Sequence, residues 1–106
     1  MAWLILFLAG LFEVGWAVGL KYTDGFTRPG PTLATVAAMA MSLWLLGIAM
    51  KTLPLGTAYA VWVGVGTIGT VILGIVLLNE PVNALRLISV ALILAGIIGL
   101  KLATAV

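Results

Sequence analysis

Residues 55–78 read LGTAYAVWVGVGTIGTVILGIVLL, and no side chain in this run carries a charge. A helix of roughly 20 apolar residues crosses the hydrocarbon core of a bilayer. Three more stretches of the 106-residue chain are apolar in the same way, and charged and turn-forming residues separate them. The sequence therefore predicts four membrane-spanning helices, over about residues 3–20, 32–50, 55–78 and 84–100.

The composition is typical of a membrane protein. Hydrophobic residues make up 64% of the chain and charged residues 8%, whereas soluble domains carry about 25% charged residues. So few charges cannot cover a soluble surface, and a net charge of +2 does not indicate a nucleic-acid interface. The short connections leave no room for a second domain. We expect one all-α domain over residues 1–106, embedded in the lipid bilayer, with neighbouring helices antiparallel.

Two residue types that carry much enzyme chemistry are missing. The chain has no Cys and no His, which excludes disulfides, thiolate nucleophiles and the usual zinc sites. The sequence shows no nucleophile–base pair, metal-ligand set or cofactor loop. We therefore expect no enzyme activity, no metal and no cofactor.

Glu13 is the residue best suited to carry a function. It lies near the middle of the first predicted span, where a charged side chain costs on the order of 3 kcal/mol. Burial disfavours the charged form of a carboxyl group, and a bound cation favours it. One such group can hold either a proton or a cation, which is the minimum requirement for proton/cation antiport. A protonated glutamate with a structural role is the alternative.

Aromatic residues accompany this carboxyl group at helical spacing. Trp16 lies three residues after Glu13 and Gly10 three residues before it, so all three share a helix face. Tyr59 and Trp62 repeat the spacing in the third span. Aromatic faces attract cations, which favours a cation site. Belt residues at the membrane interface, or packing residues, are the alternative interpretation.

Ser42 lies in the second span at a depth comparable with that of Glu13. Its hydroxyl group either donates to Glu13 or contacts a polar ligand, or it bonds to the carbonyl group four residues earlier in its own helix.

The basic residues give a nearly balanced topology signal. Four spans put Lys51 and Lys101 on one side of the membrane, with Lys21, Arg28 and Arg86 on the other. Cytoplasmic loops normally hold an excess of Lys and Arg. The chain thus has either one weakly specified topology or two opposite orientations. Two orientations permit an antiparallel homodimer, which would supply the inverted pair that larger transporters build within one chain.

Small residues mark the last two spans. Gly64 and Gly66 indicate either a bend, which alternating access needs, or close packing. The fourth span has almost no other polar feature, and we expect it to form the dimer interface. Its small residues are Ala91, Ala95, Gly96 and Gly99.

These motifs resemble those of the small multidrug resistance transporters from end to end. The matching stretches are FEV at 12–14, KY at 21–22, GFTR at 25–28, LPLGTAYAVW at 53–62 followed by Gly64 and Gly66, and Glu80 with Pro81. Trp16 and Ser42 resemble the guanidinium-exporting branch, because the multidrug branch tends to carry a small residue at the position of Trp16.

The resemblance implies an antiparallel, dual-topology homodimer of four-helix protomers in the bacterial inner membrane. It implies export of guanidinium or a small guanidinyl compound in exchange for protons, with Glu13 binding proton and substrate in turn. It further implies a kink in the third helix at Gly64 and Gly66 and dimer contacts through the fourth helix. The residues expected to line the substrate site are Gly10, Trp16, Ser42, Tyr59 and Trp62.

Three alternatives stay open. Within the same family, the chain is a polyspecific exporter of quaternary ammonium compounds. Outside it, the chain is a passive small-ion channel or a membrane subunit without transport activity. Guanidinium is planar and donates hydrogen bonds in its plane, which suits paired carboxylates. A quaternary ammonium ion cannot donate such bonds and suits a wider aromatic cavity.

Overall fold

The computed structural model describes residues 1–104 and contains four helices. They are α1 (Ala2–Tyr22), α2 (Pro29–Ala49), α3 (Leu55–Leu78) and α4 (Ala84–Ala103). Each helix is long and apolar enough to cross a membrane. These helices confirm the all-α class and the four predicted membrane-spanning helices.

The helix ends follow from local chemistry. Helix α2 begins at Pro29, before the apolar stretch starts, because proline fits the first turn of a helix, where no backbone donor is needed. Helix α3 ends at Asn79, which is left-handed with φ of 55°. Helix α4 begins after Asn83, whose side chain accepts a hydrogen bond of 2.9 Å from the backbone N–H of Arg86.

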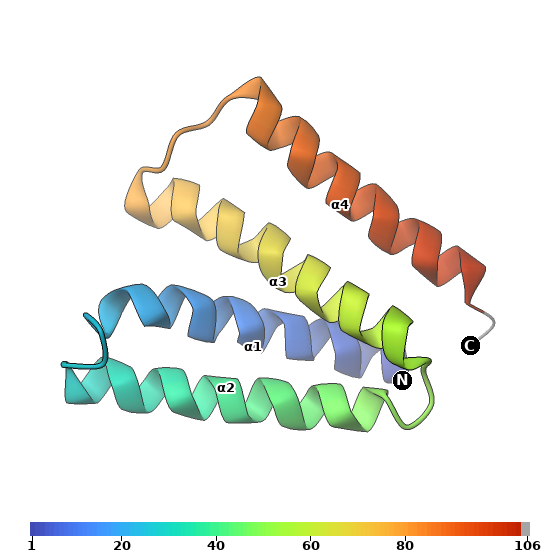
Figure 1. Ribbon diagram of the computed structural model, residues 1–106, viewed down its shortest axis with the longest axis horizontal. Coiled ribbons are helices and arrows are strands. Elements are labelled where there is room, and N and C mark those ends of the chain that lie inside the picture. Colours follow the sequence, from blue (N-terminus) through green and yellow to red (C-terminus); the bar gives the residue numbers. More distant parts are fainter. Residues whose placement is uncertain (105–106) are drawn as a thin grey trace.

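Helix α1 packs against both α2 and α3, and α4 packs against α3 (Figure 1). Helices α3 and α4 lie closest at the end where α4 finishes, beside the start of α1, and separate toward their connection. The buried core lies where α1, α2 and α3 meet and includes Leu6, Leu46, Val61 and Trp62. Three helices thus form a packed unit, and the fourth is attached along one side.

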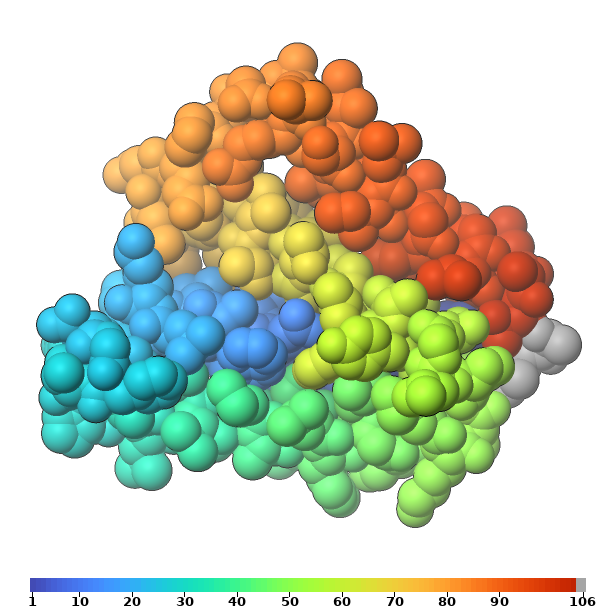
Figure 2. Space-filling model, viewed as in Figure 1, coloured from blue at the N-terminus to red at the C-terminus, as the bar shows by residue number. Residues whose placement is uncertain are grey.

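Helices α3 and α4 leave open space where they separate. A cavity of about 320 Å³ lies between α3 and the first half of α4, with Val71 and Ile93 in its lining, and Figure 2 shows the hollow beneath α4. Nearer the termini, Gly64 lets the helices touch, because a Cβ atom there would lie 3.0 Å from Ile97 Cγ1.

Helix α4 has no buried residue. The four positions expected at a dimer interface, Ala91, Ala95, Gly96 and Gly99, are all exposed in the single chain. A Cβ atom added at Gly96 or Gly99 would meet nothing within 4 Å. The homodimer and the single-domain boundaries stay predictions.

Candidate functional site

The carboxylate of Glu13 lies against the backbone of α3 at Gly66. A Cβ atom at position 66 would lie 2.6 Å from each carboxylate oxygen of Glu13, which is closer than side-chain atoms can approach. Glycine at this position leaves room for the carboxylate where it lies. The Oε1 atom of Glu13 is buried and has no hydrogen-bond partner within residues 1–104. The carboxylate therefore keeps an unused acceptor at the α1–α3 contact.

Gly10 brings the same helices together one turn away. A Cβ atom there would lie 2.7 Å from Cβ of Val65 and 3.7 Å from the backbone nitrogen of Gly66. Gly10 is buried and clears space for α3, so in this chain it sets the helix spacing that holds Glu13 against Gly66.

A cavity of about 270 Å³ adjoins Glu13. The polar residues of its lining are Glu13, Thr67, Thr70 and Glu80. The hydroxyl oxygen of Thr70 is buried and, like Glu13 Oε1, has no hydrogen-bond partner in the described chain. The cavity thus combines two carboxylates with hydroxyl groups, a set of oxygen acceptors suited to a cation that donates hydrogen bonds.

Ser42 joins three helices through hydrogen bonds. Its hydroxyl group on α2 donates to the backbone carbonyl of Ala9 on α1 over 2.7 Å. It accepts from the indole N–H of Trp62 on α3 over 2.9 Å. Ser42 and Trp62 are both buried. The hydroxyl proton therefore goes to the backbone of α1, and neither to Glu13 nor to a carbonyl of its own helix.

Trp62 connects the buried Ser42 hydroxyl group to an aromatic residue at the surface. Its ring centroid lies 5.6 Å from that of Tyr59, with a tilt of 56° between the ring planes, and Tyr59 is exposed. Trp16 on α1 is partly buried, and its indole nitrogen has no hydrogen-bond partner in residues 1–104. Tyr59 therefore offers exposed aromatic surface, and Trp16 offers an indole N–H, that the single chain leaves unused.

The expected site residues form two groups within one chain. Glu13, Gly10 and Gly66 meet at the α1–α3 contact, and Ser42 and Trp62 meet where α1, α2 and α3 converge. Helix α3 is continuous through Gly64 and Gly66, where both glycines permit close contacts, and the kink stays a prediction.

Sequence reasoning missed Glu80 as a lining residue of the Glu13 cavity. Its place beside a proline at the end of α3 indicates a solvated turn. The structure turns the chain back at Asn79, so that the backbone N–H of Glu80 donates to the carbonyl of Gly74 over 3.2 Å. Asn79, with Pro81 two residues later, signals the left-handed end of the helix, but no spacing in the sequence places the Glu80 side chain against α3.

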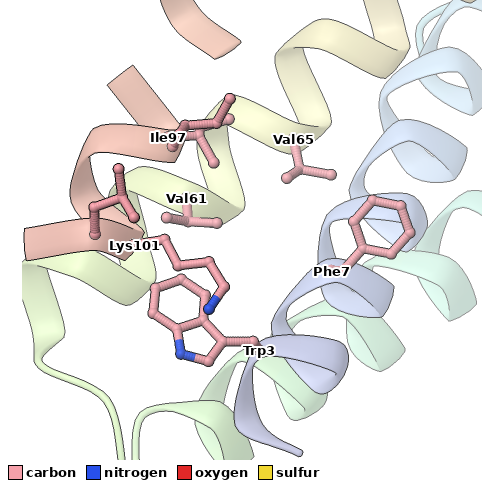
Figure 3. Close-up of a pocket in the computed structure, with 8 residues that line it drawn as sticks. Trp3, Phe7, Val61, Val65, Ile97 and Lys101 are labelled. Atoms are coloured by element: carbon pink, nitrogen blue, oxygen red, sulfur yellow. The ribbon is translucent and has the colours of Figure 1, made fainter. Parts of the chain in front are cut away.

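A second cavity, of about 250 Å³, lies among α1, α3 and α4 and is almost entirely apolar. Figure 3 shows Trp3 and Phe7 on one side of it and Val61, Val65 and Ile97 on the other. The ammonium group of Lys101 lies 4.8 Å from the ring centroid of Trp3. This cavity has no carboxylate and already faces a cation, so it does not suit a small cationic substrate.

Comparison with known proteins connects this geometry to a family. The family model described as "Small Multidrug Resistance protein" matches residues 1–93. A protein of Yersinia pestis named guanidinium exporter is 62% identical over 104 residues, which cover 98% of this chain and all of that protein. Proteins of the same name from Escherichia coli O6:H1 and Proteus vulgaris are 64% and 58% identical, over 98% of this chain and 99% and 100% of their own lengths.

Proposed function

The chain belongs to the small multidrug resistance family, and from that premise we propose that it exports guanidinium in exchange for protons across the bacterial inner membrane. The observation that carries this proposal is the Glu13 carboxylate, which lies against Gly66 with one buried oxygen that has no partner in the described chain. The names of the relatives, each a guanidinium exporter, support the choice of substrate.

The chemistry of the carboxyl group explains the exchange. A carboxylate in an apolar span favours a bound cation, and a protonated carboxyl group removes the attraction for that cation. Proton and guanidinium therefore compete for Glu13. Protons arriving from outside the cell release the cation there, and the protons leave again when a new cation binds from the cytoplasm.

Guanidinium suits this group because its N–H donors lie in one plane and can bond two carboxylate oxygens side by side. Each protomer of an antiparallel homodimer contributes its Glu13 to one shared site. Ser42 fixes Trp62 through their hydrogen bond, and Trp62, Tyr59 and Trp16 form the aromatic wall. The dimer changes between its two orientations only with protons or substrate bound. If it also changed with an empty site, protons or guanidinium could cross the membrane without the other, and the coupling would be lost.

The dimer proposal draws support from α4. This helix buries no residue in the single chain, and its small residues present a narrow face on which a second helix can pack closely.

Uptake into proteoliposomes tests the substrate and the coupling together. An outward-directed proton gradient, set by an acidic liposome interior, should drive guanidinium uptake by the wild-type protein, and Glu13→Gln should show none. Strong uptake by Glu13→Gln would contradict the mechanism. Uptake of a tetraalkylammonium ion that guanidinium fails to inhibit would favour a quaternary ammonium exporter. Flux that follows voltage and ignores the proton gradient would favour a channel.

A further inference from the structure

Glu80 shares its surroundings with Glu13 although the two residues are far apart in the sequence. Both line the cavity of about 270 Å³ between α1 and α3. Glu80 also lines a neighbouring cavity of about 150 Å³ together with Lys21. The two cavities share Ala17, Thr70 and Glu80. The two cavities therefore adjoin each other between the helix ends and Glu13, and Glu80 lines both.

The fold holds Glu80 in the lining of both cavities. A Cβ atom at position 74 would lie 2.9 Å from the carboxyl carbon of Glu80, so the carboxyl group packs against α3 at a position where glycine leaves room. The backbone N–H of Glu80 donates to the carbonyl oxygen of Gly74 over 3.2 Å. The hydrogen bond holds the backbone of Glu80 at the end of α3, and the carboxylate packs against Gly74.

The only ion pair in residues 1–104 joins Glu80 to a guanidinium group of the chain itself. Nη2 of Arg86 lies 3.3 Å from Oε1 of Glu80, and the side chains are 30% and 42% exposed. Strong pairs of this kind measure about 2.7–2.9 Å and use two parallel bonds. A single long bond in a partly exposed pair contributes little. A free guanidinium ion, which carries the same donor group without a tether, can therefore take the place of Arg86.

The charges around these two cavities make such a site useful. Lys21 lines the outer cavity and Arg86 stands beside Glu80, and both repel an approaching cation. Thr70 adds a buried hydroxyl group without a partner in the described chain, in the lining of the cavity that both carboxylates share. A carboxylate between the entrance and Glu13 offsets the repulsion and raises the local concentration of the substrate.

We propose that Glu80 is a second guanidinium-binding carboxylate, which receives the cation from water in exchange for Arg86 and delivers it to Glu13. The inference rests on the proposed guanidinium export and adds a staging site on the approach. Glu80 then governs how readily guanidinium reaches the site at low concentration. Glu13 alone governs proton exchange once the substrate is saturating.

Initial rates of guanidinium uptake into proteoliposomes, measured across substrate concentrations, separate these roles. Glu80→Gln should raise KM about tenfold, as expected when local attraction is lost, with kcat unchanged. Glu80→Asp should recover part of the loss, and Arg86→Gln should lower KM. Asp24→Asn is the matched control, since Asp24 is an exposed carboxylate of the α1–α2 loop and lines neither cavity. High salt should shrink the difference between wild type and Glu80→Gln.

Proton release on adding saturating guanidinium to purified protein completes the test, and Glu80→Gln should release as many protons as wild type. A KM equal to that of Asp24→Asn would overturn the staging site and leave the proposed export intact. A joint loss of kcat, proton release and melting temperature, with no recovery in Glu80→Asp, would assign Glu80 a purely structural role and also overturn it. A wild-type protein that neither transports guanidinium nor releases protons would overturn both proposals.

Discussion

Replacing Gly66 with alanine should displace the Glu13 carboxylate while leaving the helices in place. The added Cβ atom would lie 2.6 Å from both carboxylate oxygens, whereas ordinary van der Waals contact begins at 3.4 Å. The carboxylate oxygens must therefore retreat by at least the difference, 0.8 Å, and the carboxyl carbon, which lies still closer to the added atom, must retreat farther. The carboxylate ends a flexible side chain, so the retreat is easier than a shift of the α1 or α3 backbone, and the fold should survive.

The displacement should weaken guanidinium binding strongly. A hydrogen bond to a charged group contributes about 1.5–3 kcal/mol. Loss of one such bond between Glu13 and the substrate raises Kd by about 10- to 150-fold. Calorimetric titration of purified Gly66→Ala with guanidinium, beside the wild-type protein, measures this change directly.

Gly47→Ala is the matched control. Gly47 lies inside α2, and a Cβ atom there would meet nothing within 4 Å, so this variant should bind guanidinium as wild type does. A Kd for Gly66→Ala within about twofold of the Gly47→Ala value, equivalent to less than 0.5 kcal/mol, would refute the idea that Gly66 positions the carboxylate.

Three further substitutions probe the packing. Ser42→Ala leaves the buried indole N–H of Trp62 without its acceptor, and the unfolding free energy should fall by about 1–3 kcal/mol. A lower melting temperature in detergent would report this loss, whereas an unchanged melting temperature would mean that water replaces the hydroxyl group. Gly69→Ala drives a Cβ atom into Val14 and should cost about 1–3 kcal/mol in the same assay, where no loss would show that α1 and α3 separate easily. Gly96→Leu adds a side chain at an open position of α4, so helicity should persist while light scattering reports loss of the proposed dimer. A stable dimer of this variant would exclude this face as the interface.

The fold was accessible from the sequence because charge is nearly absent from four long stretches. Residues 55–78 form α3 over the same range, since turn chemistry bounds the apolar run closely at Pro54 and Asn79. The start of α2 at Pro29 lies outside the apolar stretch. Hydropathy marks the part of a helix that lies in hydrocarbon, and prolines in the first turn extend the helix beyond it.

The site was only partly accessible. Glu13 stands out because a carboxyl group inside an apolar span is costly. The acceptor of the Ser42 hydroxyl group, the carbonyl of Ala9, is a backbone atom on another helix, and spacing along one chain cannot identify it. Glu80 is hidden for a similar reason, because its position depends on how the chain returns to Gly74. The local sequence identifies residues whose burial in an apolar span is energetically costly, whereas tertiary packing determines which atoms they contact.

The proposed competition of proton and guanidinium for Glu13 can be measured in one experiment. Guanidinium is added to purified protein in weakly buffered detergent solution, and the pH is followed for wild type and Glu13→Gln. Release of protons by wild type, with none from Glu13→Gln, is the predicted result, because the bound cation stabilises the charged carboxylate. Equal release from both proteins, or no release from wild type, would contradict a shared proton and guanidinium site at Glu13.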